Sequence, residues 1–341
     1  MSSRYPNPAL SALVTVALAA VAVPAHAVTY MFQDVIDPLN PTFTQALGIN
    51  GAGTIVGYGN ATDFNGFRLT LPNNFTRENF PNPSPPPPTF FTQVVGINAV
   101  GNTVGFYVDT AGLNHGFTNI GGTFATVDRP GTAFNQLLGI NQNGTEIAGY
   151  SSTNPAGNTL QEAFSLVTGT TNYTDINALL VAKFGPNFNS QATGVNNSGE
   201  VVGFYQPTST TFNGFTDIGG VISSLTVPGS IDTQPLGVND LGEIVGDYTD
   251  AMGAMHGFLD NGGVFTTLDP AGSTATTVNG INNAGTVVGF YVNGAGNTIG
   301  TVGTPAAAVP EPASFALLAT GLFGLGIFAR RRRAMSSTRA R

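Results

Sequence analysis

The fold of this chain is decided by the stretch TATTVNGINNAGTVVGFY at residues 274–291. It contains two runs of apolar and β-branched residues, 274–281 and 286–291, which are typical of β-strands. The four residues between these runs begin with Asn282 and end with Gly285. That order fits a type I turn followed by a left-handed residue, so the stretch predicts a β-hairpin.

The centre of this stretch recurs along the chain. The pattern Gly-Ile/Val-Asn-x-x-Gly occurs six times, beginning at Gly48, Gly96, Gly139, Gly194, Gly237 and Gly280. Three of the intervals between copies are 43 residues long, and a fixed period of this length indicates a repeat architecture. Each copy has a second glycine within the following strand. We expect tight packing between neighbouring units at these second glycines.

Each unit predicts four short strands. In the unit before Gly280, residues 256–260 and 264–268 form a third and a fourth strand, joined by the turn Asn261-Gly262-Gly263. Four strands in about 43 residues is the size of a β-propeller blade. Residues 178–184 belong to an insertion between two units and predict one or two helical turns.

The two ends of the repeat region complement each other. Residues 30–38 match the fourth-strand pattern of residues 264–270, whereas the last unit has a weak third strand at 297–302 and no fourth. An N-terminal strand that fills this gap would close a ring and remove two exposed edges. We therefore predict an all-β domain at residues 28–303, a six-bladed β-propeller closed by the N-terminal strand.

Residues 1–27 have the features of a secretory signal peptide. Arg4 is the only charged residue before an apolar stretch at residues 9–23. Ala25 and Ala27 then provide the small residues of a cleavage site, with cleavage after Ala27. This predicts export through the Sec machinery. The alternative is a retained membrane anchor.

Residues 304–341 form a linker and a tail with three parts in a fixed order. A short motif, Val309-Pro310-Glu311-Pro312, precedes an uncharged apolar segment at 313–329 and the run Arg330-Arg331-Arg332-Arg333. The apolar segment is at the lower limit for a transmembrane helix, and the arginines would hold its end in the cytoplasm. The simplest interpretation is one transmembrane helix, with the domain outside and no other contact with the membrane.

This tail resembles the PEP-CTERM sorting signal, because all three parts occur in the order found in that family. The resemblance implies a transient inner-membrane anchor and processing near the Pro-Glu-Pro by an exosortase-type peptidase. It also implies export in a Gram-negative, exopolysaccharide-producing bacterium, toward the cell surface or the biofilm matrix.

The repeat units resemble HAF-type extracellular repeats, which are named for a His-Ala-Phe at the third strand. The match covers approximately residues 30–300. It implies no defined biochemical function. Only the phenylalanine is constant among the matching triplets, which are Asn65-Gly66-Phe67, His115-Gly116-Phe117, Glu162-Ala163-Phe164, Asn213-Gly214-Phe215 and His256-Gly257-Phe258.

Composition excludes several functions. The chain has no cysteine, so it can form neither a disulfide nor a thiolate metal site. Of its 19 acidic residues only Glu311 lies outside residues 28–309, a region whose cations are Arg68, Arg77, Arg129 and Lys183. A domain this acidic should repel nucleic acid.

The sequence offers few candidates for chemistry. His115 and His256 occupy the same repeat position, which indicates a structural position rather than a catalytic base. We predict no catalytic residue, no cofactor and no dedicated metal site. Among metal ions, calcium is the strongest alternative, because several acidic residues lie near turns. They are Asp128, Asp240, Glu243, Asp247, Asp250 and Asp269.

Aromatic residues repeat after the second glycine of each unit. Tyr107, Tyr205 and Tyr291 each follow a phenylalanine, and they could form a platform for sugars on one face of the ring. The alternative is that both rings pack within and between blades. The function predicted is therefore non-catalytic binding of exopolysaccharide or another matrix component. The alternative is a secreted propeller-type glycoside hydrolase, which would need two carboxylates in one central cleft.

Overall fold

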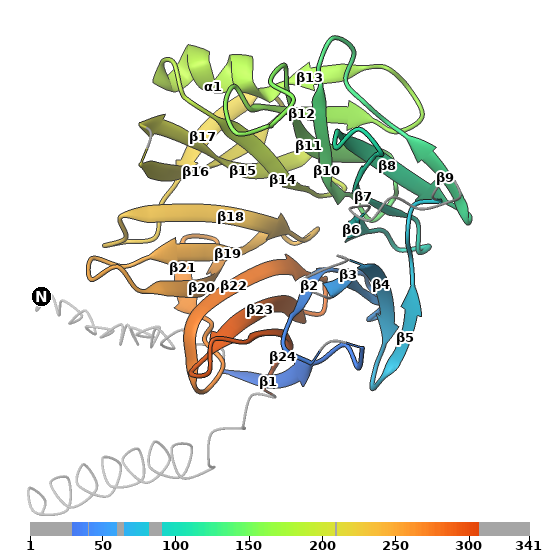
Figure 1. Cartoon of the computed structure of the whole chain (residues 1–341). Helices are drawn as coiled ribbons and strands as arrows, with labels where there is room; N and C mark the ends of the chain where they lie inside the picture. The colour runs from blue at the N-terminus through green and yellow to red at the C-terminus, as the bar shows by residue number, and fades with distance from the viewer. Residues whose placement is uncertain (1–28, 40, 60–64, 82–90, 209, 307–341) are drawn as a thin grey trace, which may run out of the picture.

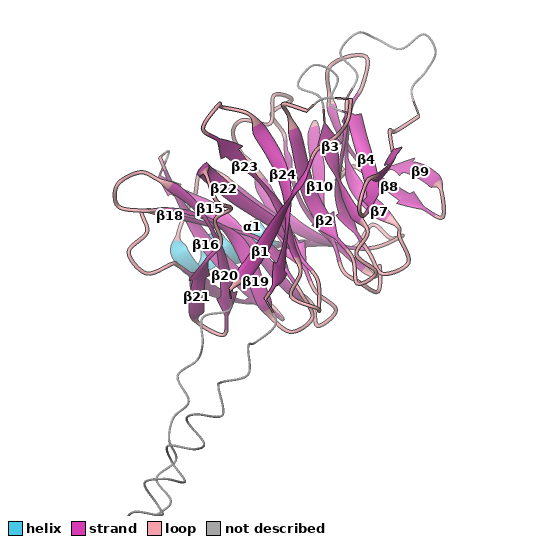
Figure 2. Ribbon diagram, turned by 90° about the horizontal axis from the view of Figure 1, so that it is seen from below, coloured by secondary structure: helices cyan, strands magenta, loops and turns pink. Residues whose placement is uncertain are grey.

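The computed structural model describes residues 29–39, 41–59, 65–81, 91–208 and 210–306. This part of the chain forms six four-stranded antiparallel sheets arranged around a central axis (Figure 1). The fold is a six-bladed β-propeller, as the repeats predict. Strands dominate every blade (Figure 2), and one short helix lies at the outside of the ring (Figure 1).

The blades follow one another along the chain, each built from the inner strand outward. The strands of blades 1 to 3 are β2 (Thr44–Ile49), β3 (Ile55–Gly59), β4 (Asn65–Thr70), β5 (Asn74–Arg77), β6 (Thr92–Ile97), β7 (Thr103–Val108), β8 (Asn114–Ile120), β9 (Thr123–Thr126), β10 (Phe134–Ile140), β11 (Glu146–Ser152), β12 (Glu162–Val167) and β13 (Tyr173–Asp175). Those of blades 4 to 6 are β14 (Ser190–Val195), β15 (Glu200–Thr208), β16 (Thr211–Ile218), β17 (Val221–Leu225), β18 (Asp232–Val238), β19 (Glu243–Thr249), β20 (Met255–Asn261), β21 (Val264–Thr267), β22 (Ser273–Ile281), β23 (Val287–Asn293) and β24 (Thr298–Pro305).

The N-terminal strand closes the ring. Strand β1 (Tyr30–Val35) pairs antiparallel with β24, from Tyr30 opposite Pro305 to Val35 opposite Gly300. Blade 6 therefore takes its outer strand from the beginning of the chain, as predicted. The weak third strand expected at 297–302 is a full strand that extends to Pro305, past the expected domain end at residue 303. The closure pairs the edges that two adjoining chain ends would otherwise expose.

The insertion after blade 3 contains the helix α1 (Ile176–Phe184), which confirms the expected helical turns. Its N-cap is Asp175, whose side chain accepts a hydrogen bond from the Ala178 amide at 2.9 Å. Ile176 and Leu180 are fully buried and fix the helix against the blades. Within the described residues no helix combines the length and the apolar character needed to cross a membrane. The apolar segment at 313–329 lies outside those residues.

In four of the six units the repeated asparagine of the motif makes two kinds of contact. In blade 6, Asn282 Oδ1 accepts hydrogen bonds from the amides of Ala284 and Thr286, which holds the hairpin turn. Its Nδ2 donates to the carbonyl oxygen of Asn50 in blade 1 at 3.1 Å. The same bond to the next blade is made by Asn50, Asn196 and Asn239. The asparagine thus shapes its own turn and joins neighbouring blades.

Replacing Asn282 with aspartate should destabilise the protein by about 2 kcal/mol, because the buried donor to the Asn50 carbonyl is replaced by a charged acceptor. The control is Asn141→Asp. Asn141 is equally buried, but its Nδ2 donates to the hydroxyl of Thr145, which can reverse and donate to a carboxylate. Urea unfolding of both variants checks this. Equal losses of stability in the two would contradict the joining role.

The first glycine of each motif lets the inner strands meet at the axis. A Cβ atom on Gly139 would lie 2.8 Å from the Thr193 carbonyl oxygen and 3.0 Å from the Gly194 Cα atom. The other first glycines face the next blade in the same way, and a β-bulge precedes each of them. Backbone therefore contacts backbone around the whole ring.

The second glycines do not pack between blades, so that expectation was wrong. A Cβ atom on Gly57 would lie 2.0 Å from the Gln45 carbonyl oxygen and 3.0 Å from the ring of Phe67, both in the same blade. The phenylalanine of the third strand is fully buried, as Phe67, Phe117 and Phe215 show. The second glycine makes room for this ring and for the bulged inner strand.

Candidate functional site: a glutamine-lined central depression

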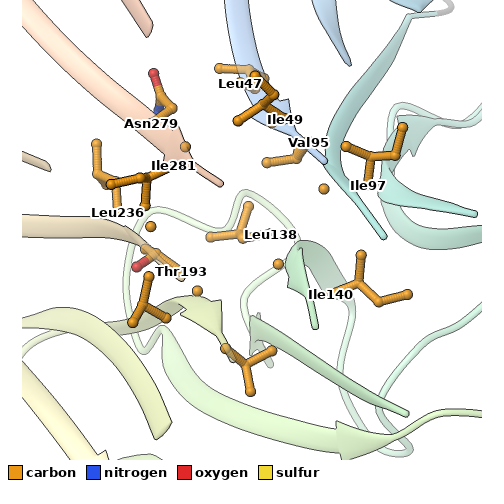
Figure 3. Close-up of a pocket in the computed structure, with 18 of the residues that line it drawn as sticks. Leu47, Ile49, Val95, Ile97, Leu138, Ile140, Thr193, Leu236, Asn279 and Ile281 are labelled. Carbon is orange, nitrogen blue, oxygen red and sulfur yellow. The ribbon is translucent and has the colours of Figure 1, made fainter. Parts of the chain in front are cut away.

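The axis of the propeller has a narrow waist. The waist is a cavity of 60 Å³ surrounded by the six first glycines and by the residues on either side of them. Figure 3 shows Leu47, Val95, Leu138 and Leu236 around this centre, with Thr193 and Asn279 completing the set. Apart from Thr193, Asn279 and Gln142, the side chains that line the waist are apolar.

A wider depression of 250 Å³ adjoins the waist, at the end of the axis where the inner strands begin. It shares six residues with the waist, namely Leu47, Val95, Leu138, Thr193, Leu236 and Asn279. Its remaining lining includes two phenylalanines, Phe106 and Phe204, and five glutamines. The glutamines are Gln45, Gln93, Gln136, Gln191 and Gln234.

The five glutamines occupy one position of the repeat, three residues before the first glycine of the motif. Blade 6 has Thr277 there. Because the inner strands radiate from one axis, this single position forms a ring of amides at the mouth of the depression. Sequence reasoning missed this ring, although aligning the units on their glycines would have shown the repeated glutamine.

Hydrogen bonds within the protein hold three of these amides, and Gln136 is held through both of its amide atoms. Gln136 Oε1 accepts from the Tyr150 hydroxyl at 2.9 Å. Gln191 Nε2 donates to Gln161 Oε1 at 2.8 Å, and Gln234 Nε2 lies 3.5 Å from a carboxylate oxygen of Asp247. The amides are therefore positioned before any ligand arrives.

Asp247 is an exception among the blades. Its position, next to the second glycine, holds an aromatic residue in the other five units: Tyr58, Phe106, Tyr150, Phe204 and Phe290. Asp247 is only 5 % exposed. Burial raises the pKa of Asp247 to about 7, and the negative charge of Asp232 adds to the rise. A carboxyl group that is half protonated near neutral pH thus lies beside Gln234.

Asn279 contributes a second unusual polar group. Its Oδ1 atom is buried and has no hydrogen-bond partner among the described residues. It lines both the waist and the depression. A buried acceptor without a partner is costly unless water or a ligand supplies a donor.

The three tyrosines proposed as a sugar platform do not lie on an open surface. Tyr107, Tyr205 and Tyr291 are 9, 5 and 8 % exposed. Tyr107 stacks on Phe80 with ring centroids 3.8 Å apart, and Tyr205 stacks on Phe184 at 5.1 Å. This burial favours the packing alternative. The rings that line the depression are those of Phe106 and Phe204, which precede Tyr107 and Tyr205.

The two histidines are part of a repeated loop structure. His115 Nδ1 lies 2.6 Å from Asp128 and its Nε2 3.3 Å from Asp109. Burial lowers the pKa of His115, but hydrogen bonds and charges from Asp128 and Asp109 outweigh it and leave the pKa raised. His256 has the same arrangement with Asp269 and Asp250. Each histidine bridges two acids that hold neighbouring loops.

The acids considered for calcium are dispersed. Within the described ranges no group of three or more His, Asp or Glu side chains is arranged to hold a metal ion. Asp240 accepts hydrogen bonds from Asn197 and Asn283, and Glu243 from Asn239. The cleavage residues Ala25 and Ala27 and the tail residues 309–312 and 330–333 lie outside the described residues.

Comparison with known proteins identifies the tail. The PEP-CTERM protein-sorting motif is matched at residues 308–333. It implies an exported protein with a transient C-terminal membrane anchor that an exosortase recognises. No curated protein matches the sequence.

Several solved structures are similar to this chain. A protein of unknown function from Dyadobacter fermentans is similar at 8% identity, with 83% of this chain and 100% of that chain covered and a TM-score of 0.50. The six-bladed lectin of Aleuria aurantia is 10% identical, with 80% of this chain and 99% of that chain covered and a TM-score of 0.44. The β-propeller domain of the trilobed protease from Pyrococcus furiosus is 8% identical, with 79% of this chain and 97% of that chain covered and a TM-score of 0.45. At such low identity the first of these similarities, with its TM-score of 0.50, supports the fold and nothing more.

Proposed function

We propose that this propeller is a non-catalytic binding protein of the cell surface or extracellular matrix, and that exopolysaccharide or another matrix component is its ligand. The sorting motif supports export. The resemblance of the units to HAF-type extracellular repeats supports an extracellular role. The source organism is then a Gram-negative bacterium that makes exopolysaccharide, the setting in which such tails occur.

The observation that carries the proposal is the lining of the central depression. It combines amide side chains with two phenylalanine rings and aliphatic residues, and no charged side chain of the described chain lines it. Amides both donate and accept hydrogen bonds, as the hydroxyl groups of sugars do. Apolar walls with a few positioned polar groups are the usual composition of a small-molecule site.

The alternative is a glycoside hydrolase, and one observation favours it. Asp247, whose pKa is raised to about 7, lies near the acid Asp232, and such a pair resembles a general acid beside an ionised carboxylate. However, Asp247 is almost completely buried, and neither acid lines the depression. A substrate in the depression would not reach them, so we retain the binding function.

The exported protein, purified from the producing cells, should co-sediment with their insoluble exopolysaccharide and should leave its chain length unchanged. Binding without cleavage is expected because the depression offers amides and rings but no carboxylate pair. The measurements are the bound fraction and the number of reducing ends over time. A steady rise in reducing ends that Asp247→Asn abolishes would establish the hydrolase instead.

Intact mass and location of the same protein test the sorting step. A chain that begins at Val28, ends near Glu311 and is found in the matrix fits the proposal. A chain that keeps residues 313–341 in the inner membrane contradicts it.

A further inference from the structure

We propose that the central depression is itself the ligand site, and that it takes one uncharged, hydroxyl-rich sugar unit at the end of a carbohydrate chain. This inference rests on the proposed function and names the site and the ligand class. It is carried by three properties of the depression: its charge, its hydrogen-bonding groups and its shape.

The first property is charge. The described cations are engaged elsewhere or lie away from the axis. Arg68 pairs with Glu78, Arg77 with Asp37, and Arg129 with Glu162 and Asp175. Lys183 is on α1, at the outside of the ring. An acidic sugar would find no counter-charge in the depression, and it would meet the carboxyl of Asp247 behind Gln234.

The second property is the balance of donors and acceptors. In the described part of the chain, Gln191 and Gln234 use their Nε2 atoms in hydrogen bonds, and their Oε1 atoms have no partner. The buried Oδ1 of Asn279 adds a third acceptor that lacks a donor. These three oxygens can therefore accept hydrogen bonds from a ligand that donates. Sugar hydroxyls donate, whereas ionised carboxylates and sulfates only accept.

The third property is shape. The depression has a volume of 250 Å³, below the about 300–1,000 Å³ of sites for drug-sized ligands, and it narrows to the 60 Å³ waist. The waist is closed in by backbone, because each first glycine contacts the next inner strand. A polysaccharide cannot thread through such an axis. It can enter only with its end, and the depression has room for one small unit.

The experiment uses exopolysaccharide from the producing cells, partly hydrolysed and separated by anion exchange into neutral and acidic oligosaccharides. Binding of each fraction to the exported protein is measured by calorimetry. We expect the neutral fraction to bind. Gln45→Ala combined with Gln191→Ala should weaken that binding roughly tenfold or more, because at least one ligand hydrogen bond is lost.

The matched control is Gln33→Ala. Gln33 is an exposed glutamine on the outer strand β1, away from the axis, so its loss should leave the affinity unchanged. End-on binding adds a second readout. The molar affinity should stay constant as the oligosaccharide grows beyond two or three units, whereas a groove that holds the middle of a chain would gain affinity with length.

A measurement on the wild-type protein covers the case in which the glutamine variants misfold. Side-chain amide NMR signals of the ring glutamines should shift when the neutral fraction is added. Neutral binding that leaves both these signals and the variants unaffected would overturn the site but keep the proposed function. Preference for the acidic fraction would overturn the ligand class. Failure of both fractions to bind would overturn the site together with the proposed function.

Discussion

An Asp247→Asn protein will be more stable than the wild type above pH 7 and equally stable near pH 4. Asp247 is buried in a position where the other blades have an aromatic ring, and its burial together with the charge of Asp232 raises its pKa to about 7. Asparagine has the same shape and can keep the contact with Gln234, but it never ionises.

The direction of this effect follows from proton binding. Between pH 4 and 7 the folded protein holds a proton on Asp247, whereas the unfolded chain, with the ordinary aspartate pKa of 3.8, releases it. Folding is therefore favoured at low pH and loses this contribution as pH rises through 7. The wild type should lose about 4 kcal/mol over that range from this one group, and the variant should not.

Urea unfolding at pH 4, 6 and 8 measures the difference. The control is Asp250→Asn in the same blade. A hydrogen bond from the Ala254 amide is the first of several contacts that lower the pKa of Asp250, so its replacement should reduce stability at pH 8. If Asp247→Asn were no more stable than the wild type at pH 8, Asp247 would have to be stabilised as an anion by a contact that the described residues do not include.

Persistence of a destabilising acid beside the depression bears on function. Natural proteins keep such residues where activity depends on them, and a substitution that gains stability there commonly reduces function. The Asp247→Asn protein should therefore be tested in the sugar-binding assay as well. Its affinity will show whether the acid serves mainly to hold Gln234.

The architecture could be predicted from the sequence because the glycine and asparagine motif recurs at regular intervals along the chain. The glycine and asparagine of each motif are demanded by the backbone contacts at the axis and by the turn, so every blade must repeat them. The closing strand was recognisable because residues 30–38 repeat the fourth-strand pattern. These requirements are local to each unit, so the same residues recur in every unit.

The candidate site could be predicted only in part. The aromatic pairs were visible, but which member of Phe106 and Tyr107 faces the axis depends on strand register, and a bulge in the inner strand alters that register. The sequence therefore suggested the tyrosine, and the structure places the phenylalanine in the depression. The repeated glutamine could be seen in the sequence. That these glutamines meet in one ring could be recognised only from the arrangement of the six inner strands around the axis.

Replacing Gly57 with alanine should destabilise the protein by about 3 kcal/mol or more. The added Cβ atom would lie 2.0 Å from the carbonyl oxygen of Gln45, a backbone atom that no side-chain rotation can move. It would also press on the ring of Phe67, which is fully buried in the core of blade 1. Overpacking of this kind strains both the strand pair and the core.

Gly51→Ala provides the matched control, because it makes the same chemical change in the same blade. Gly51 has ordinary backbone geometry, and a Cβ atom there would meet no atom within 4 Å. Its free energy of unfolding in urea should stay within about 0.5 kcal/mol of the wild type. Equal free energies of unfolding in the two variants would mean that the bulged inner strand can shift at little energetic cost. The glutamines that precede five of the six bulges would then not be held rigidly, and the preorganised amide ring on which the binding proposal depends would lose its support.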